Sequence, residues 1–430
     1  MRSKVKIGFD DKPIRNARRR LRVGIIDADL LDNGTRHPNL ALLKISGFCK
    51  SLNHNVRLIC SYDEILQNRR QYNIIVLSKV FKFTKIPCAI EQLIAKGKIY
   101  IGGTGFYEID GPILPDIVEH FMPDYHLYDE YIGIHSTEGV SSKPNSKWAD
   151  YQDFSIGFTT RGCIRRCGFC VNRLLNRVVE WSPISEFYDR TRSKIYLWDD
   201  NIMAAPPKIF HKIIKELNDT GVPFQFRQGL DIRLMTENKA KLLSSVKYYG
   251  DYIFAFDHYN MNDPIEKKQV DETIAGLKVW RSVCDKSTKL YVLVAYDSID
   301  ERDIEGTFFR IKTLMEFGCL PYIMRFEKYK DSRFKDMYIQ LARWCNQPNF
   351  FKKMSFRQYC IRNEEYHQGL NKVYNSLEYR NKLMFPRGFK RKDRYSSCYA
   401  AMINFEAEFP EIAKAYFDIR FEELNQYNIR

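Results

Sequence analysis

Three cysteines within eight residues carry the clearest chemical signal in this sequence. Cys163, Cys167 and Cys170 follow a Cys-x3-Cys-x2-Cys spacing. Three thiolates on one tight loop can hold three corners of a 4Fe–4S cube. The loop has no fourth cysteine, so the fourth iron would keep an open coordination position. An open iron at a reducing cluster is suited to chemistry on a bound molecule rather than to a purely structural role.

Two other interpretations of these cysteines are a zinc site and three ordinary thiols. A structural zinc site normally has four protein ligands, often as two separated Cys-x2-Cys pairs. No second pair lies near this loop in the sequence, and no histidine occurs between Gly139 and Asn201. The spacing therefore favours an iron–sulfur cluster.

The residues around the cysteines extend the pattern. Phe169 stands directly before the last cysteine, and an apolar, strand-like run, Phe154–Thr160, precedes the loop. Gly162 and Gly168 allow the backbone to come close to an inorganic cluster. Together these features resemble the radical S-adenosylmethionine (radical SAM) superfamily.

The resemblance implies a cofactor set and a reaction. In that family the open iron chelates the amino and carboxylate groups of SAM. One electron then cleaves SAM into methionine and a 5′-deoxyadenosyl radical, which abstracts hydrogen from an unactivated carbon. The resemblance also implies an electron donor, either flavodoxin-like or ferredoxin-like. It identifies neither the substrate nor a catalytic residue.

The region in front of the cysteines, residues 21–125, alternates strand-like and helix-like segments. Short apolar runs suited to buried parallel strands alternate with segments whose apolar residues have helical spacing. Such alternation predicts a doubly wound, Rossmann-like sheet. The predicted strands are Val23–Asp27, Asn73–Ser78 and Lys98–Gly103, and the predicted helices are 39–51 and 86–96.

The same region resembles the cobalamin-binding domain found in front of many radical SAM cores. That family's signature is Asp-x-His-x-x-Gly, followed by Ser-x-Leu and Gly-Gly. Here Leu31 stands in place of the histidine that would ligate cobalt, and His37 lies off the pattern. Two alternatives are open: cobalamin bound without that ligand, or a domain that keeps only the fold. The matching segments are Asp29–Gly34, Ser78–Val80 and Gly102–Gly103.

Beyond a linker at residues 126–150, strand–helix alternation resumes. Six repeated units predict a partial TIM-like (β/α)6 barrel, the fold of the radical SAM core, over residues 151–330. A complete eight-unit barrel is the nearest alternative, but the units end near Tyr329. The six predicted strands are 154–159, 194–198, 224–227, 252–256, 290–294 and 321–325.

Polar residues at the carboxyl ends of these strands are candidate cofactor-binding residues, because ligands of an α/β barrel sit there. The second strand ends where the family contacts the amino group of SAM, although the usual Gly-Gly-Glu is absent. Together with the aromatic residue of the cysteine loop, the candidates are Phe169, Asp199, Asp200, Asn201, Gln228, Asp231, Arg233, Asp257 and Arg325.

Two arginines are candidates for binding the carboxylate of SAM. Arg233 is the first choice, since a guanidinium can bind a carboxylate through two parallel hydrogen bonds, and Arg325 could serve in the same way. Each arginine also fits an ordinary ion pair at the barrel rim. His258, which follows the fourth strand, is a candidate proton-transfer group.

Residues 331–430 lose the strand signal. Met337, Leu341 and Trp344 recur at helical spacing, and aromatic residues are dense and interleaved with lysine and arginine. We predict a mainly helical, basic C-terminal domain in which these aromatic residues pack a small core. The alternative is that they stack on nucleic-acid bases.

The net charge of +15 favours an anionic partner such as RNA, DNA or a phosphorylated substrate. Positive charge gathers in an N-terminal basic arm, residues 1–20, expected to be flexible or peripheral, and in Arg387–Tyr395. Nucleic acid is therefore a candidate partner. The alternative is a basic surface that is merely solvated.

No segment predicts a membrane span or a signal peptide. No run approaches the roughly 18 apolar residues of a span, and the N-terminus has no apolar signal core. The chain has 11 cysteines, and those outside the loop are scattered along the sequence. This distribution fits buried thiols in a reducing compartment. We therefore expect a cytoplasmic protein without a membrane partner.

Taken together, the sequence predicts a radical SAM enzyme that uses a 4Fe–4S cluster to modify an unidentified substrate. Methylation is the natural outcome if cobalamin binds. One alternative is a cobalamin-independent hydrogen-abstraction enzyme with a purely structural front domain. The other is a nucleic-acid-binding protein whose cluster is structural or redox-sensing.

Overall fold

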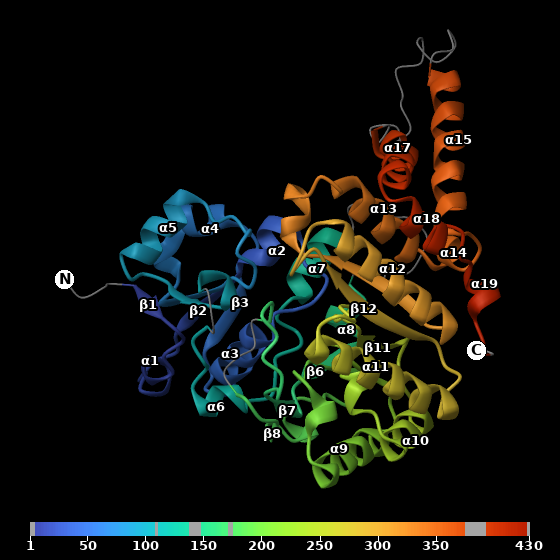
Figure 1. The fold of residues 1–430 in the computed structure, drawn as a ribbon. Helices are drawn as coiled ribbons and strands as arrows, with labels where there is room; N and C mark the ends of the chain where they lie inside the picture. Colours follow the sequence, from blue (N-terminus) through green and yellow to red (C-terminus); the bar gives the residue numbers. More distant parts are fainter. Residues whose placement is uncertain (1–4, 108–110, 137–147, 171–174, 375–392, 428–430) are drawn as a thin grey trace. The chain divides into compact units, whose positions relative to one another are not determined.

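The computed structural model describes residues 5–107, 111–136, 148–170, 175–374 and 393–427. The chain divides into two compact units, Met1–Gln228 (unit 1) and Gly229–Arg430 (unit 2). Each unit combines parallel strands with helices (Figure 1). The predicted α/β class is therefore confirmed.

Unit 1 contains a five-stranded sheet in the order β1-β5-β4-β2-β3, in which every pair is parallel. Its strands are β1 (Lys6–Ile7), β2 (Arg22–Asp27), β3 (Asn55–Leu58), β4 (Ile74–Ser78) and β5 (Tyr100–Gly102). The helices in this part of the chain are α1 (Lys12–Arg15), α2 (Ala28–Asn33), α3 (Leu40–Ser51), α4 (Tyr62–Asn68) and α5 (Cys88–Ala95). Strands β2, β4 and β5 and helices α3 and α5 match the predicted elements.

Both faces of this sheet are buried, which explains the continuous apolar runs in its central strands. Along β2, Ile25 lies in one hydrophobic core and Ile26 in the other. Strand β4 alternates in the same way, with Val76 in the first core and Leu77 in the second. Successive side chains of a strand point to opposite faces, so a sheet covered on both sides needs a continuous apolar run.

The N-terminal segment is not the flexible arm that its basic composition predicted. Strand β1 pairs in parallel with β5, placing Lys6 opposite Tyr100. Phe9 and Ile14 are buried in the first core, and the Nε2 atom of His54 lies 3.0 Å from the carbonyl oxygen of Ile14. These few apolar residues hold the basic segment, residues 5–16, at the edge of the sheet.

Asp27 is a buried carboxyl group at the end of β2. Its carboxylate accepts hydrogen bonds from the backbone N–H of Leu30 (3.1 Å) and the hydroxyl of Tyr128 (2.7 Å). The first bond caps α2, and the second ties the strand end to residue 128 of the predicted linker. Burial raises the pKa of Asp27 to about 6, although both hydrogen bonds oppose the rise.

We expect Asp27→Asn to remove a pH dependence of stability. The unfolded chain ionises this carboxyl group near its ordinary pKa, whereas the folded protein keeps the proton up to a pKa of about 6. The contribution of Asp27 to the free energy of unfolding is thus most favourable at low pH. It declines by about 3 kcal/mol in total as pH rises from about 4 to 6. Asparagine cannot ionise and still accepts from Leu30. Urea unfolding across this pH range measures the difference.

The matched control is Asp116→Asn, because the side chain of Asp116 is 99% exposed. This variant should keep the wild-type pH dependence of the unfolding midpoint. An Asp27→Asn protein that followed the wild-type curve over the same range would contradict the contribution assigned to Asp27.

The rest of unit 1 holds a three-stranded parallel sheet in the order β10-β9-β6. Part of the predicted linker is packed rather than loose, since Tyr128, Tyr131 and Ile132 belong to the first core. Linker residues 137–147 lie outside the described residues. The elements are α6 (Asp116–Glu119), α7 (Asp129–Ser136), α8 (Ala149–Gln152), β6 (Phe154–Gly157), β7 (Thr160–Arg161), β8 (Val179–Glu180), β9 (Lys194–Leu197), α9 (Pro207–Asp219) and β10 (Phe224–Phe226).

Unit 2 begins with a second three-stranded parallel sheet, in the order β11-β12-β13. Residues of β12 alternate between buried and half-buried along its length, and Leu290, Val292 and Val294 are fully buried. Its elements are α10 (Glu237–Ser245), β11 (Tyr252–Ala255), α11 (Pro264–Val283), β12 (Thr288–Val294), α12 (Glu301–Glu316) and β13 (Leu320–Arg325).

The C-terminal part of unit 2 is helical within its described residues, as predicted. Aromatic residues hold it together: Phe356 and Phe351 are fully buried and both contact Trp344. The packing interpretation is confirmed for these residues, whereas Arg387–Tyr395 and the side chains of 366–397 lie outside the described part. The helices are α13 (Lys335–Cys345), α14 (Pro348–Phe351), α15 (Phe356–Tyr374), α17 (Asp393–Glu408), α18 (Pro410–Tyr416) and α19 (Phe421–Leu424).

All six strands predicted for the radical SAM core are present, as β6, β9, β10, β11, β12 and β13. They form two three-stranded sheets, and the boundary between the compact units falls between β10 and β11. The closed arrangement of a partial barrel stays a prediction, as do the domain boundaries at residues 20, 125, 150 and 330. No helix in the described ranges is both long and apolar enough to cross a bilayer.

Candidate functional site

The cysteine loop leaves β7 and returns to β8, which pairs with β7 in antiparallel fashion. The backbone N–H of Cys163 donates to the carbonyl oxygen of Leu175 at 3.1 Å, closing the base of the loop. Gly162 has a φ of +96°, and a Cβ atom there would lie 2.0 Å from the carbonyl oxygen of Arg177. Glycine is therefore required at this position for both conformation and space.

Asp199, at the carboxyl end of β9, anchors the segment that leads into the loop. Its buried carboxylate accepts hydrogen bonds from the backbone N–H groups of Thr159 (3.1 Å) and Thr160 (2.6 Å). It also accepts from the hydroxyls of Thr159 (2.6 Å) and Thr160 (2.7 Å). Burial raises the pKa of Asp199, and these four hydrogen bonds oppose the rise.

The next two residues contact the loop itself. The carboxylate of Asp200 accepts from the backbone N–H of Gly162 at 2.7 Å. The side-chain amide of Asn201 donates to the sulfur of Cys163 at 3.3 Å, and the backbone N–H of Arg165 donates to the same sulfur at 3.3 Å. N–H donors directed at a cysteine sulfur favour its thiolate and tune a cluster bound to it.

The loop carries three cysteines of the kind that could hold a three-thiolate cluster. Cys163, Cys167 and Cys170 are all half-buried and lie on one short segment. Within the described ranges, no three histidine, cysteine or acidic side chains are gathered around a common point as metal ligands. The cysteines fit a cluster by residue type, by their shared loop and by the N–H donors on Cys163.

The structure gives the residues after β9 a role that the sequence did not predict. Asp199, Asp200 and Asn201 position the cysteine loop through their side chains, whereas contact with SAM stays a prediction for all three. Phe169 is 37% exposed and Gln228 is exposed, so both side chains can reach a ligand, and their contact with SAM also stays a prediction.

The remaining candidates belong to unit 2. The carboxylate of Asp231 accepts from Nε of Arg233 at 2.7 Å, and Nη1 of Arg233 donates to the side-chain oxygen of Gln269 at 2.5 Å. Both members of the ion pair are largely buried. The ion pair that was the alternative interpretation of Arg233 is thus present. Arg325 is exposed at the end of β13, with its guanidinium 4.6 Å from the ring centre of Tyr329.

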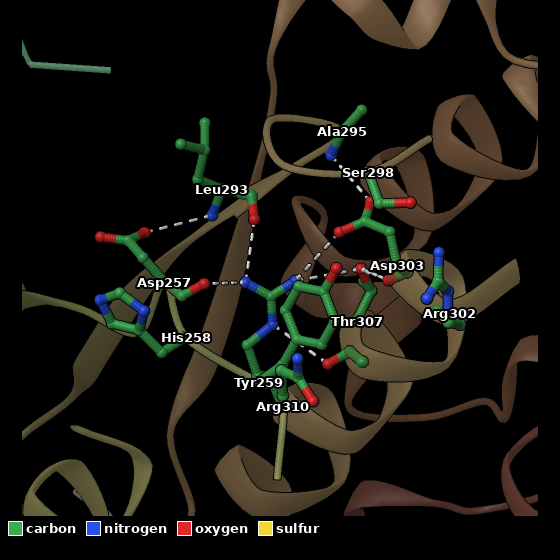
Figure 2. A network of polar contacts seen from close by, with 12 residues as sticks. Asp257, His258, Tyr259, Leu293, Ala295, Ser298, Arg302, Asp303, Thr307 and Arg310 are labelled. Carbon is green, nitrogen blue, oxygen red and sulfur yellow. Dashed lines mark hydrogen bonds and ion pairs between the residues drawn. The ribbon is translucent and has the colours of Figure 1, made fainter. Parts of the chain in front are cut away.

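Asp257 lies in a network centred on Arg310 of α12 (Figure 2). Arg310 is fully buried and donates from Nη1 to the carbonyl oxygens of Asp257 and Leu293, both at 2.9 Å. The carboxylate of Asp303 lies 4.0 Å from Nη2 of Arg310 and accepts from the backbone N–H of Ala295 at 2.8 Å. One guanidinium therefore ties the carboxyl ends of β11 and β12 to α12.

Two titratable groups sit beside this arginine. Burial raises the pKa of Asp257, against the attraction of the Arg310 charge. Burial lowers the pKa of His258, and the charge of Arg233 adds to the lowering. A histidine that is neutral near physiological pH can accept a proton, so His258 keeps its place as a candidate proton-transfer group.

A cavity of about 520 Å³ opens beside the network, lined by residues that follow β11 and β12. Carboxylates contributed by Glu266, Asp297 and Glu305 share its lining with the ring of Tyr259. A Cβ atom at Gly306 would lie 2.0 Å from that ring, so the glycine allows Tyr259 to pack directly on α12. The cavity has the position expected of a ligand site, at the carboxyl ends of parallel strands.

After β2 and β4 of the five-stranded sheet, residues of the cobalamin-like signature form hydrogen bonds within the chain. The carboxylate of Asp29 accepts from the backbone N–H groups of Val80 (2.6 Å) and Phe81 (3.2 Å) and from the hydroxyl of Thr84 (2.5 Å). The segment after β4 is thereby held against the start of α2.

The structure offers no imidazole at the position of the cobalt ligand. Leu31 has no donor atom, and both ring nitrogens of His37 are engaged. Its Nδ1 contacts the carboxylate of Asp150, and its Nε2 lies 3.1 Å from Nη2 of Arg227. These residues do not fit a histidine-ligated cobalamin.

Sequence reasoning missed Thr159, Thr160 and Arg310 as parts of these sites. The two threonines directly precede Arg161-Gly162-Cys163, and that adjacency was the available signal. Arg310 lies between Phe309 and Ile311, where a charged residue inside an apolar helical stripe could have indicated a buried ion pair.

No protein-family model matches this chain, and no curated protein matches it. Matching solved structures include two of a cobalamin-dependent S-adenosylmethionine radical enzyme, OxsB, one with aqua-cobalamin bound and one selenomethionine-labelled apo form. Their identities to this chain are 13% and 15%, with a TM-score of 0.34 for each. The matches cover 71% of this chain and 49% of the other, so the chain spans about half the length of those structures. A likeness at this level carries no argument about function.

Proposed function

We propose that this protein is a radical SAM enzyme that abstracts hydrogen from an unidentified organic substrate. In this proposal Cys163, Cys167 and Cys170 hold a 4Fe–4S cluster. Such a cluster, when bound with one open iron, supplies the electron that cleaves SAM into methionine and a 5′-deoxyadenosyl radical. The observation that carries the proposal is the cysteine loop, whose base and first cysteine are held by three consecutive residues.

The residues of this chain have separate tasks in the proposal. Asp199 and Asp200 hold the backbone on the amino side of Cys163, while Asn201 and Arg165 direct N–H groups at its sulfur. These donors stabilise negative charge on the sulfur and so support a reducible cluster. SAM itself would be bound by the loop, Phe169 included, and by candidate residues at the strand ends such as Gln228.

Leu31 and His37 supply no imidazole for cobalt, so the proposal stops at hydrogen abstraction, and methyl transfer would require a cobalamin bound without a histidine ligand. The front sheet of unit 1 then acts as a scaffold. An anionic substrate, nucleic acid included, remains the expectation from the net charge of +15. A flavodoxin-like or ferredoxin-like donor would provide the electron.

The test is anaerobic reconstitution with iron and sulfide, followed by reduction in the presence of SAM. We expect the wild-type protein to bind about four irons per chain and to release 5′-deoxyadenosine, measured by chromatography. Cys167→Ala should lose both, because two thiolates cannot replace three. Cys88→Ala is the matched control, since Cys88 is an exposed thiol of α5, and it should behave as wild type.

Two results would overturn the proposal. Stoichiometric zinc in place of iron after reconstitution would favour a zinc site. A stable four-iron cluster that never releases 5′-deoxyadenosine, even with added cell extract as a source of substrate, would favour a structural or sensing cluster.

A further inference from the structure

Two cysteines that are far apart in the sequence lie together in unit 2. Cys360 belongs to α15 and Cys398 to α17, and their sulfur atoms are 3.4 Å apart, joined by an S–H···S hydrogen bond. Both residues are fully buried. Asn363, one turn after Cys360, donates from its side-chain amide to the sulfur of Cys398 at 3.6 Å. The two thiols therefore share a small polar site between packed helices.

The alignment of the two helices is fixed by a second contact. Arg357 of α15 donates to both carboxylate oxygens of Glu406 of α17, at 2.7 Å and 2.8 Å. Arg357 lies about one turn before Cys360, and Glu406 lies about two turns after Cys398. Helices α15 and α17 pack side by side (Figure 1), so this pair and the sulfur contact hold one antiparallel register.

The two thiols differ in their readiness to ionise. Burial raises the pKa of Cys360 above the ordinary range of a thiol. The hydrogen bond between the two sulfurs lowers the pKa of Cys398, and the amide of Asn363 acts in the same direction. A thiolate is the nucleophile in thiol oxidation, and a neighbouring thiol completes the disulfide. This division of roles is the one that an oxidisable pair requires.

We propose that Cys360 and Cys398 form an oxidation site that closes to a disulfide between α15 and α17. With hydrogen peroxide, the sulfur of Cys398 attacks one oxygen, the O–O bond breaks, and a sulfenic acid and water form. The sulfur of Cys360 then displaces the hydroxyl group as a second water, forming the S–S bond. Two thiols lose two electrons and two protons, and one peroxide becomes two waters.

Access and geometry are consistent with this reaction. A disulfide has an S–S length of about 2.05 Å, so the sulfurs must approach by little more than an ångström. Ile361 and Tyr399, the next residues along each helix, are 39% and 36% exposed, which places the pair one layer beneath the surface. A small oxidant reaches such a site through local opening of the helix pair.

The test is to treat the full-length protein with hydrogen peroxide, alkylate the free thiols and map peptides by mass spectrometry without reduction. We expect a linked peptide containing Cys360 and Cys398, two hydrogens lighter than the separate thiol peptides and released by dithiothreitol. The oxidised protein should also melt several degrees higher, because the link closes a long segment of chain. Cys398→Ala should show neither change, and Cys398→Ser replaces it if the alanine variant does not fold.

Two internal controls make the result decisive. Cys88 is exposed, so its oxidation shows that the oxidant is active. Cys345 of α13 is only 1% exposed, so its oxidation would show that the oxidant enters the protein core without selectivity. The proposal is overturned if Cys360 and Cys398 are recovered as separately alkylated peptides at a dose that oxidises Cys88. It is also overturned if Cys345 is oxidised as readily as the pair.

Discussion

Asp199→Ala is expected to lose most of its bound iron and to unfold at a lower denaturant concentration than the wild type. The carboxylate of Asp199 accepts four hydrogen bonds from Thr159 and Thr160, directly before the cysteine loop. Alanine leaves two buried backbone N–H groups without an acceptor, at a cost of about 1–3 kcal/mol each. Iron per chain after anaerobic reconstitution and the midpoint of urea unfolding measure the two effects.

Two further variants separate anchoring of the loop from general destabilisation. Asp200→Ala removes the acceptor of one loop N–H, that of Gly162, and a long ion pair with Arg161, so it should lose less iron than Asp199→Ala. Asp219→Ala, at a side chain that is 57% exposed, should load iron as the wild type does. Wild-type iron content and stability in Asp199→Ala would show that Asp199 does not position the loop.

The contrast between Asp199 and the cysteines shows what sequence reasoning can and cannot reach. Cys163, Cys167 and Cys170 are close together in the sequence, so the chemistry of the loop can be predicted from neighbouring residues. Asp199 lies about 40 residues away from the threonines that it anchors. Its position at a strand end was predicted, but an acid at a strand end can face either a ligand or the chain itself, and only the fold decides between them.

The strands were predictable for a similar reason. A parallel strand buried on both faces needs apolar residues on both of its sides, as in the middle of β2 and β4, and this leaves a continuous apolar run in the sequence. Strand β1 leaves no such run, because only Ile7 of its two residues is apolar and it lies at the sheet edge. The basic composition of the N-terminal segment therefore predicts an arm, although Phe9 and Ile14 are buried in the first core.

Pairings across long separations were the least predictable features. Cys360 and Cys398 showed no framework spacing in the sequence, yet two packed helices bring their sulfurs to 3.4 Å. For Arg233 an ion pair at the barrel rim was the alternative interpretation, but the structure and not the sequence identifies Asp231 as its partner. Spacing alone does not predict interactions between helices, because these depend on how the helices pack.

The second large effect is expected for Arg310→Met, which should destabilise unit 2 by about 3–5 kcal/mol. The guanidinium of Arg310 is fully buried, and methionine fills similar space without any donor. The carbonyl oxygens of Asp257 and Leu293 would lose a donor, and the buried carboxylate of Asp303 would lose the neighbouring positive charge. Urea unfolding, together with hydrogen exchange of unit 2, measures the loss.

Arg302→Met provides the matched control on the same helix. The side chain of Arg302 is 76% exposed and is paired with Asp300, so its loss should leave the unfolding midpoint close to that of the wild type. Adding Asp303→Asn to Arg310→Met should recover part of the stability, because it removes the unpaired buried charge. Equal stability of the Arg302→Met and Arg310→Met proteins would mean that the network in Figure 2 does not hold β11 and β12 to α12.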